Sequence, residues 1–270
     1  MIPQRNLSLL SNRLARAGGR RIPESVLERD YCIAWFLAGL SGTSLSERLV
    51  FKGGTAIKHC YFGDYRFSED LDFTLLNEVE FETIRRELDE VFAKIRQASG
   101  IELRYAREDR HSHANSHTFY LSYEGPLPAA PARKEIKVDV TIRERIVFPL
   151  AKERALKVYD EYTDLPADAI VHVYTLAEIA TEKVVALCDR ARNEPRDLYD
   201  IWYLMNGKYV DLSIMTAAIA DKLAFRDRTL DGISNELLAK EERLRKLWSA
   251  RLSHQVALLP EFLDVFRAVQ

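Results

Sequence analysis

Residues 51–73 read FKGGTAIKHCYFGDYRFSEDLDF and hold the most informative pattern in the chain. Two adjacent glycines precede a threonine, and Asp70 and Asp72 follow with one leucine between them. Side-by-side glycines weaken a helix or strand, and neighbouring carboxylates repel each other when both are ionised. Both costs are expected where a bound phosphate and a bound cation offset them.

Alternating side chains place acids on one face of two predicted strands. In EDLDFTLL (69–76) the apolar residues alternate with Asp70 and Asp72, and in KEIKVDVTI (134–142) they alternate with polar residues that include Asp139. If the two strands are neighbours, the three carboxylates gather on one face. Such a cluster is unfavourable unless it is protonated or holds cations, and Mg²⁺ takes oxygen ligands of this kind. We therefore predict a site for Mg²⁺ or Mn²⁺.

The glycines predict a phosphate site beside those carboxylates. A Gly-Gly turn that leads into a helix exposes backbone N–H groups to an anion, and the helix dipole adds to the attraction. TAIKHCYF (55–62) predicts a short helix with Thr55 as its N-cap. The predicted phosphate contacts are Lys52, Gly53, Gly54, Thr55 and Lys58. The pattern is not a P-loop, which needs Gly-Lys followed by Ser or Thr.

The remaining periodicity predicts a mixed α/β half followed by a helical half. Helices are expected over 7–17, 23–39 and 80–100, and strands over 49–51, 71–76, 101–107, 117–125, 134–142 and 171–175. Further helices are expected over 176–191, 195–207, 212–224, 235–252 and 260–270. We assign 1–175 to an α/β domain with amino-terminal helices and 176–270 to a helical domain that completes a cleft.

Composition predicts a soluble protein of a reducing compartment. A chain of 270 residues with 47% hydrophobic content suffices for one large or two modest domains, and a net charge of −2 gives no global sign of nucleic-acid binding. The three cysteines have neither disulfide nor zinc spacing, and no signal peptide or membrane span is present. We expect the protein to be cytoplasmic. Zinc is not predicted at His111, His113 and His117, which lack the i, i+4 helical spacing of a zinc site.

The opening stretch closely resembles the signature of AbiEii-type toxins, a branch of the polymerase-β-like nucleotidyltransferases that includes the mycobacterial MenT toxins. The family's glycine pair and threonine match Gly53, Gly54 and Thr55, and its Arg-x-Ser-x-Asp-x-Asp pattern matches Arg66, Ser68, Asp70 and Asp72. A helical lysine and an Arg-Asp-Leu-x-Asp segment of the family resemble Lys183 and residues Arg196, Asp197 and Asp200. The resemblance covers residues 49–205.

The resemblance implies a fold, an activity and partners. The implied fold is α/β (α+β), a polymerase-β-like mixed sheet flanked by helices and followed by a carboxy-terminal helical region. The implied protein is a toxin of a bacterial toxin–antitoxin system that transfers NMP from Mg·NTP to an RNA acceptor, the 3′ end of tRNA, and that has a cognate antitoxin. The implied catalytic residues are Asp70, Asp72, Lys183 and Asp197, and the implied nucleotide contacts add Arg66 and Ser68 to the phosphate contacts. Asp139, placed beside them by the strand alternation, is also expected to be catalytic and either completes the metal set or acts as base towards the acceptor hydroxyl.

Several alternatives stay open on the residues alone. Lys183 either neutralises a triphosphate or lies on a solvated face paired with Glu178 or Glu182. Residues 1–21 carry Arg5, Arg13, Arg16, Arg20 and Arg21 without an acid and, with the basic helix from Lys240 to Arg251 and its Trp248, either bind RNA or serve solubility. Small-molecule nucleotidyl transfer is a rival activity. A non-catalytic nucleotide- or RNA-binding module is another, although the intact Asp-x-Asp argues against it.

Overall fold

The computed structural model describes residues 1–17, 21–109, 114–128 and 134–270, which form two compact units. Unit 1 comprises Met1–Glu144 and Leu150–Val173, and unit 2 comprises Arg145–Pro149 and Tyr174–Gln270. Arg20, His111 and His113 lie outside the described residues. None of the helices formed by the described residues is both long and apolar enough to cross a membrane.

Unit 1 is built on a mixed sheet. The described residues give seven strands in the order β3-β4-β5-β2-β1-β7-β6. Their bounds are Leu49–Lys52 (β1), Asp70–Leu75 (β2), Glu102–Glu108 (β3), Ser116–Glu124 (β4), Glu135–Thr141 (β5), Leu150–Arg154 (β6) and Ile170–Tyr174 (β7). β2 runs parallel to β5 and antiparallel to β1. The predicted mixed α/β fold is confirmed; β6 was missed because its sequence, LAKER, is largely charged and lacks an apolar face.

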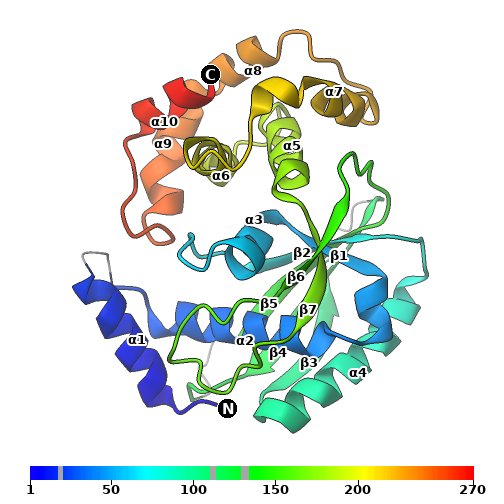
Figure 1. The fold of residues 1–270 in the computed structure, drawn as a ribbon, viewed down its shortest axis with the longest axis vertical. Helices are drawn as coiled ribbons and strands as arrows, with labels where there is room; N and C mark the ends of the chain where they lie inside the picture. Colours follow the sequence, from blue (N-terminus) through cyan, green and yellow to red (C-terminus); the bar gives the residue numbers. More distant parts are fainter. Residues whose placement is uncertain (18–20, 110–113, 129–133) are drawn as a thin grey trace. The chain divides into compact units, whose positions relative to one another are not determined.

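Helical segments pack around this sheet. They are α1 (Gln4–Arg16), α2 (Glu24–Leu40), the 3₁₀ turn η1 (Ser44–Glu47), α3 (Gly53–Ala56), the π turn η2 (Ile57–Tyr61) and α4 (Phe81–Ser99). Figure 1 shows α2 and α4 beside the sheet, and the ring of Phe36 on α2 lies 6.2 Å from that of Phe73 on β2. Gly39 lets α2 approach Ile95 of α4, because a Cβ there would collide with that side chain. On the opposite face of β2, the acidic residue Asp72 lies against the glycine turn at the start of α3.

Unit 2 is helical, as the periodicity predicts. Its elements are α5 (Leu176–Leu187), α6 (Pro195–Asn206), η3 (Leu212–Ile214), α7 (Thr216–Ala224), α8 (Ile233–Ala239), α9 (Glu241–Leu252) and α10 (Phe262–Val269). The single helix predicted over 235–252 is two helices that meet at Lys240. The ammonium of Lys240 is buried and donates to the carbonyl oxygens of Leu187, Asp189 and Arg192, so it ties this junction to the end of α5.

A buried carboxylate holds the segment Arg145–Pro149 within unit 2. Glu178 on α5 accepts hydrogen bonds from the backbone N–H groups of Val147 and Phe148, at 3.0 and 2.8 Å. The ammonium of Lys222 lies 2.7 Å from Glu178 and 3.3 Å from Glu182, so both acids are paired with Lys222.

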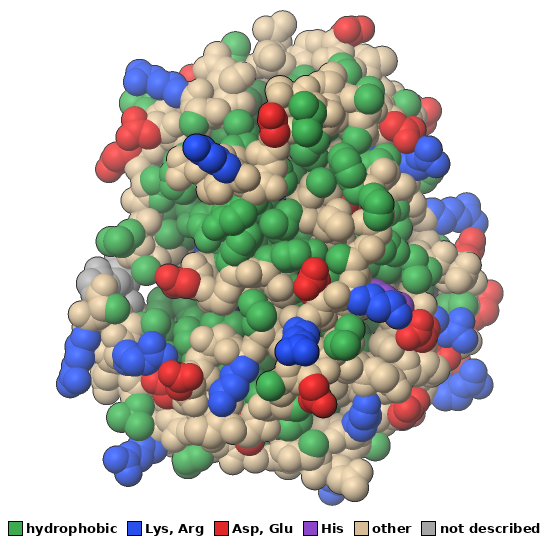
Figure 2. Space-filling view, viewed as in Figure 1, with side chains coloured by type: hydrophobic (Ala, Val, Ile, Leu, Met, Phe, Trp, Pro, Cys, Tyr) green, Lys and Arg blue, Asp and Glu red, His purple; other side chains and the backbone are tan. Residues whose placement is uncertain are grey.

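Over the molecular face shown in Figure 2, basic and acidic side chains lie interspersed, in keeping with the nearly balanced charge of the chain.

Candidate active site

The sheet brings the three predicted carboxylates onto one face. β2 and β5 are parallel neighbours, and their register places Asp72 opposite Asp139 and Asp70 opposite Lys137. On its other side β2 pairs with β1, which places Lys52 opposite Asp72. The strand adjacency on which the sequence prediction depended is therefore present.

Two side chains hold Asp139. The ammonium of Lys137 lies 2.6 Å from Asp139 Oδ2, and the hydroxyl of Thr118 on β4 donates to Asp139 Oδ1 at 2.5 Å. Partial burial alone would lower the pKa of Lys137, but its hydrogen bond to Asp139 and the charges of Asp139, Asp70 and Asp72 raise that pKa above its ordinary value. Lys137 therefore stays charged and offsets the mutual repulsion of the carboxylates.

The donor chemistry of this face fits a hard divalent cation. Carboxylate oxygens on adjacent strands are the ligands that Mg²⁺ and Mn²⁺ prefer. Among the described residues, however, no set of three acidic, histidine or cysteine side chains already converges on one point as a metal site would. Lys137 and Thr118 hold both oxygens of Asp139. Asp70 and Asp72 are the residues that would hold the ion.

The two glycines bring the backbone against this face. Gly53 has a φ of +77°, and a Cβ added there would lie 2.5 Å from Asp72 Oδ2. A Cβ at Gly54 would collide with the guanidinium of Arg66, a side chain that is almost fully buried. Only glycine fits either position without a shift. The turn therefore places bare backbone beside one carboxylate and one guanidinium.

The structure gives Thr55 and Ser68 a bracing role. α3 begins at Gly53 with Lys52 as its N-cap, so the prediction of Thr55 as the N-cap was wrong. Thr55 is fully buried, and its hydroxyl lies 2.7 Å from Ser68 Oγ and 2.5 Å from the carbonyl oxygen of Asp70. These bonds fix the glycine turn to the start of β2. The hydroxyl of Thr55 is thus turned to the protein, contrary to its predicted contact with phosphate.

Lys58 is also placed differently from the prediction. Its side chain is fully buried, 3.0 Å from the hydroxyl of Tyr159, 3.8 Å from Asp30 and 4.5 Å from the ring centre of Phe67. Burial lowers the pKa of Lys58, and Asp30 opposes that shift. The assignment of Lys58 to the phosphate site is corrected: its helical position turns it into the core of unit 1. Lys52 remains on the carboxylate face and donates to Thr141 at 3.1 Å.

The second predicted group lies in unit 2 and forms a compact charge cluster. The ammonium of Lys183 lies 2.7 Å from Asp197 Oδ1 and 2.9 Å from Asp200 Oδ2, and Arg192 Nε lies 2.6 Å from Asp197 Oδ2. Burial alone would raise the pKa of Asp197, but Lys183 and Arg192 hold it below its ordinary value. Lys183 is therefore paired with acids of α6. The alternative, in which Lys183 pairs with Glu178 or Glu182, does not hold, because those two acids pair with Lys222.

Two predicted RNA contacts are occupied by the protein itself. Arg13 makes a two-point ion pair with Glu161, with both N···O distances at 2.7 Å. Trp248 is buried, and its indole N–H donates to the carbonyl oxygen of Pro260 at 3.0 Å. Trp248 therefore packs in the core of unit 2, and the suggestion that it could lie against a base or sugar is corrected.

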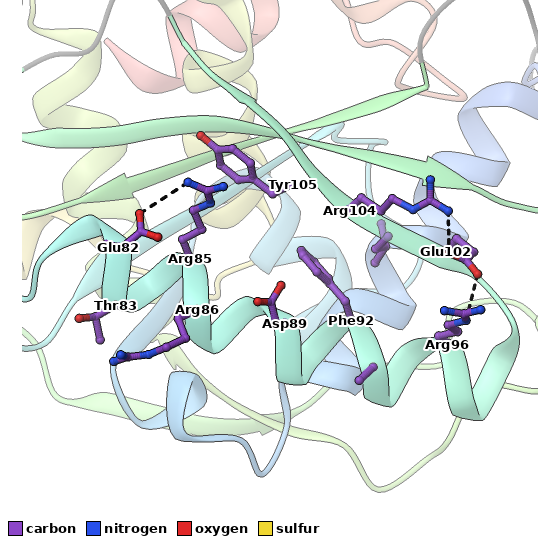
Figure 3. Close-up of a pocket in the computed structure, with 12 residues that line it drawn as sticks. Glu82, Thr83, Arg85, Arg86, Asp89, Phe92, Arg96, Glu102, Arg104 and Tyr105 are labelled. Carbon is purple, nitrogen blue, oxygen red and sulfur yellow. Dashed lines mark hydrogen bonds and ion pairs between the residues drawn. The ribbon is translucent and has the colours of Figure 1, made fainter.

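A large groove lies elsewhere on unit 1. It has a volume of about 820 Å³ and runs between α4 and β3, where Figure 3 shows arginines from both elements. Arg85 lies 3.6 Å from Glu82, and Glu102 takes Arg96 and Arg104, both at 3.0 Å. None of the described site residues discussed above lines this groove. The carboxylate face, and not this groove, is therefore the candidate active site.

Comparisons with known proteins identify a matching family and several similar structures. The family model described as "Nucleotidyl transferase AbiEii toxin, Type IV TA system" matches residues 35–269. Among solved structures, the chain is similar to JHP933 of Helicobacter pylori, with 18% identity over 92% of this chain and 90% of that one at a TM-score of 0.56. It is also similar to the nucleotidyltransferase toxin MenT4 of Mycobacterium tuberculosis H37Rv, with 17% identity over 97% of this chain and 86% of that one at a TM-score of 0.56.

A third similar structure is that of a putative nucleotidyltransferase from H. pylori, with 18% identity over 92% of each chain and a TM-score of 0.53. No curated protein sequence matches the chain. At these identities the similar structures support the fold alone. The family match, which spans most of the chain, supports the activity. The chain belongs to the AbiEii family of nucleotidyltransferase toxins of type IV toxin–antitoxin systems.

Proposed function

We propose that this nucleotidyltransferase transfers a nucleoside monophosphate from Mg·NTP to a hydroxyl of an RNA acceptor, the 3′ end of tRNA. The observation that carries the proposal is the register of three adjacent strands. It places Lys52, Asp72 and Asp139 in one row, with the glycine turn directly against Asp72. Phosphate, metal and acceptor chemistry all need to meet within a few ångströms, and this row supplies groups for each.

The residues of unit 1 take distinct roles in this proposal. Asp70 and Asp72 hold the divalent cation, which when bound stabilises charge on the attacking and leaving oxygens. The backbone of Gly53 and Gly54, with Arg66 behind it and Lys52 beside it, receives the triphosphate. Thr55 and Ser68 keep that turn fixed to β2 through their buried hydrogen bonds.

Asp139 is assigned the role of the base that accepts the proton of the acceptor hydroxyl. Its oxygens accept hydrogen bonds from Thr118 and Lys137, and the carboxylate keeps further lone pairs that can accept the proton of the acceptor hydroxyl. It lies on the strand next to Asp72, so a hydroxyl aimed at the α-phosphorus has a carboxylate within reach. Lys137 and Thr118 act as positioning residues that fix its orientation.

In unit 2, Lys183 is assigned the neutralisation of nucleotide phosphates and Asp197 the positioning of Lys183. The family resemblance supports the assignment, and the ion pairs with Asp197 and Asp200 fix the direction of the ammonium. A cognate antitoxin partner follows from the family, and we propose that it acts by controlling this transfer.

The test is incubation of the protein with each labelled NTP, Mg²⁺ and total RNA, followed by a denaturing gel. Label should appear in the tRNA band with one NTP or a subset of them. Asp72→Asn is the matched control and should put no label into the tRNA band. Label that appears only in small-molecule acceptors would transfer the activity to the rival substrate class, and no label in any acceptor would contradict the proposal.

A further inference from the structure

A second row of side chains runs across the carboxylate face of unit 1. The strand registers place Asp70 opposite Lys137, Lys137 opposite Tyr120, and Tyr120 opposite Arg107. The row thus crosses β2, β5, β4 and β3 and leads from the carboxylates to the edge of the sheet. With strands about 4.8 Å apart, Tyr120 lies two strands, or about 10 Å, from Asp70.

A bulge in β3 brings Arg107 to this face. Tyr105 pairs with Leu121, and after a register shift Arg107 pairs with Tyr120. In an unbroken antiparallel ladder Arg107 would lie opposite Phe119, whose buried ring contacts Phe81 of α4 on the other face. Bulges of this kind redirect side chains and are common next to active sites.

The guanidinium of Arg107 lies over the ring of Tyr120 on this face. The guanidinium carbon of Arg107 lies 3.6 Å from the centre of the Tyr120 ring, and Nη2 of Arg107 lies 2.8 Å from Glu135. The Tyr120 hydroxyl donates to Asp109 at 2.9 Å. Both side chains are therefore held by acidic partners, while 41% of the Arg107 side chain remains exposed. A fixed, exposed guanidinium plane is a surface on which a nucleobase stacks.

The position of the stack favours the acceptor over the incoming nucleotide. In phosphoryl transfer the attacking and leaving oxygens lie roughly in line on opposite sides of the phosphorus. The glycine turn follows β1, so a pyrophosphate bound there leaves towards the β1 side of Asp72. The attacking hydroxyl must then come from the β5 side, and the chain that carries it continues over β4 and β3.

We propose that Arg107 and Tyr120 form a stacking platform for a base at the 3′ end of a single-stranded RNA acceptor. This inference rests on the proposed function and names its acceptor class. A distance of about 10 Å from the carboxylates suits the terminal or preceding base of a strand whose terminal hydroxyl is at Asp139. The platform reads a π-face and no hydrogen-bonding edge, so it tolerates different bases.

The test measures stacking without transfer. A ten-nucleotide single-stranded RNA with 2-aminopurine at its 3′ end is titrated with the full chain in the absence of NTP. Wild-type protein should quench the 2-aminopurine fluorescence on binding. Arg107→Lys keeps the charge and removes the plane, so it should lose the quench and weaken RNA binding roughly tenfold with little change in salt dependence. The KM for NTP should stay unchanged.

Tyr120 variants and a matched arginine complete the design. Tyr120→Leu should behave as Arg107→Lys does, and Tyr120→Phe, which keeps the ring, should retain most of the quench. Arg85→Lys, whose guanidinium lies 4.8 Å from the centre of the Tyr105 ring in the groove of Figure 3, is the control and should bind and quench as wild type. Thermal unfolding checks that each variant is folded.

In the binding experiment, three results overturn the platform: no RNA binding, binding without quench in the wild type, or an unchanged quench in Arg107→Lys. These results are distinguishable from failure of the proposed function. If the wild type quenches the probe but transfers nucleotide to no acceptor, the transfer proposal fails and the platform stands. If it labels RNA while Arg107→Lys keeps the wild-type KM for RNA, the platform fails and the transfer stands.

Discussion

Asp72 and Asp139 lie directly opposite each other on the parallel neighbours β2 and β5. Cross-strand like charges destabilise a sheet, and Lys52 opposite Asp72 and Lys137 beside Asp139 are the compensating cations. The arrangement is tolerable without a metal ion and becomes strongly negative if either lysine is removed. The first prediction uses this balance.

Lys137→Met should lower the melting temperature by a few degrees in the absence of divalent cation, because the carboxylates lose their nearest cation. Millimolar Mg²⁺ should raise the melting temperature of the variant more than that of the wild type, since the ion then supplies the missing positive charge. Calorimetry with and without Mg²⁺ measures both shifts. Equal Mg²⁺-induced shifts in the two proteins would show that Lys137 does not oppose cation binding.

Gly53→Ala should reduce the transfer rate at least about a hundredfold, because a Cβ 2.5 Å from Asp72 Oδ2 must displace that carboxylate. Gly100→Ala is the matched control. Gly100 has a similar φ of +76°, but a Cβ there has no neighbour within 4 Å. Both variants should lose about 1 kcal/mol of stability from backbone strain, and only Gly53→Ala should lose activity. Equal activities would refute the close approach.

Lys183→Ala should destabilise the protein by about 3 kcal/mol, because it leaves Asp197 and Asp200 buried without their ammonium partner. The double variant Lys183→Met with Asp200→Asn also removes the carboxylate charge of Asp200, while Arg192 still pairs with Asp197. It should therefore recover much of the lost stability. Denaturant unfolding and transfer assays are run on both. Near-normal transfer by the folded double variant would exclude Lys183 from the chemistry.

The pKa of Asp197 gives a prediction for acid stability. Its folded-state pKa lies below the ordinary value of 3.8, so the stabilisation from its ion pairs is fully present above that pH and is lost as pH falls through the lower folded-state value. Asp197→Asn should be less stable than the wild type at pH 6, and the gap should narrow below about pH 4. Urea unfolding at a series of pH values measures the gap. A constant gap would mean that Asp197 is not ionised in the folded protein.

Local patterns made the carboxylate face predictable. Alternation in 69–76 and 134–142 assigns Asp70, Asp72 and Asp139 to faces without any knowledge of the fold. The pairing of β2 with β5 joins segments far apart in the chain. The sequence could therefore only predict that the carboxylates gather if these two strands are neighbours. Alternation also places Lys137 on this face, but nothing in the sequence pairs it with Asp139.

The misplaced residues depend on distant partners. Lys58 follows the glycine turn by one helical turn, and its burial is decided by Asp30 and Tyr159, which lie far from it in sequence. The break at Lys240 is decided by carbonyl groups at the end of α5. The bulge that redirects Arg107 leaves no signal in a run of alternating residues. Tertiary contacts override local propensity in each case.

The most direct test of the central claim is the rate of nucleotide transfer to RNA by Asp72→Asn and Asp70→Asn at saturating Mg²⁺. Each variant should fold as the wild type does, since losing one of several clustered negative charges does not strain the sheet. Transfer should fall below detection in both, and Asp139→Asn should lose it as well while retaining Mg²⁺-dependent NTP binding. Wild-type transfer by either Asp72→Asn or Asp70→Asn would contradict the assignment of this carboxylate face as the catalytic centre.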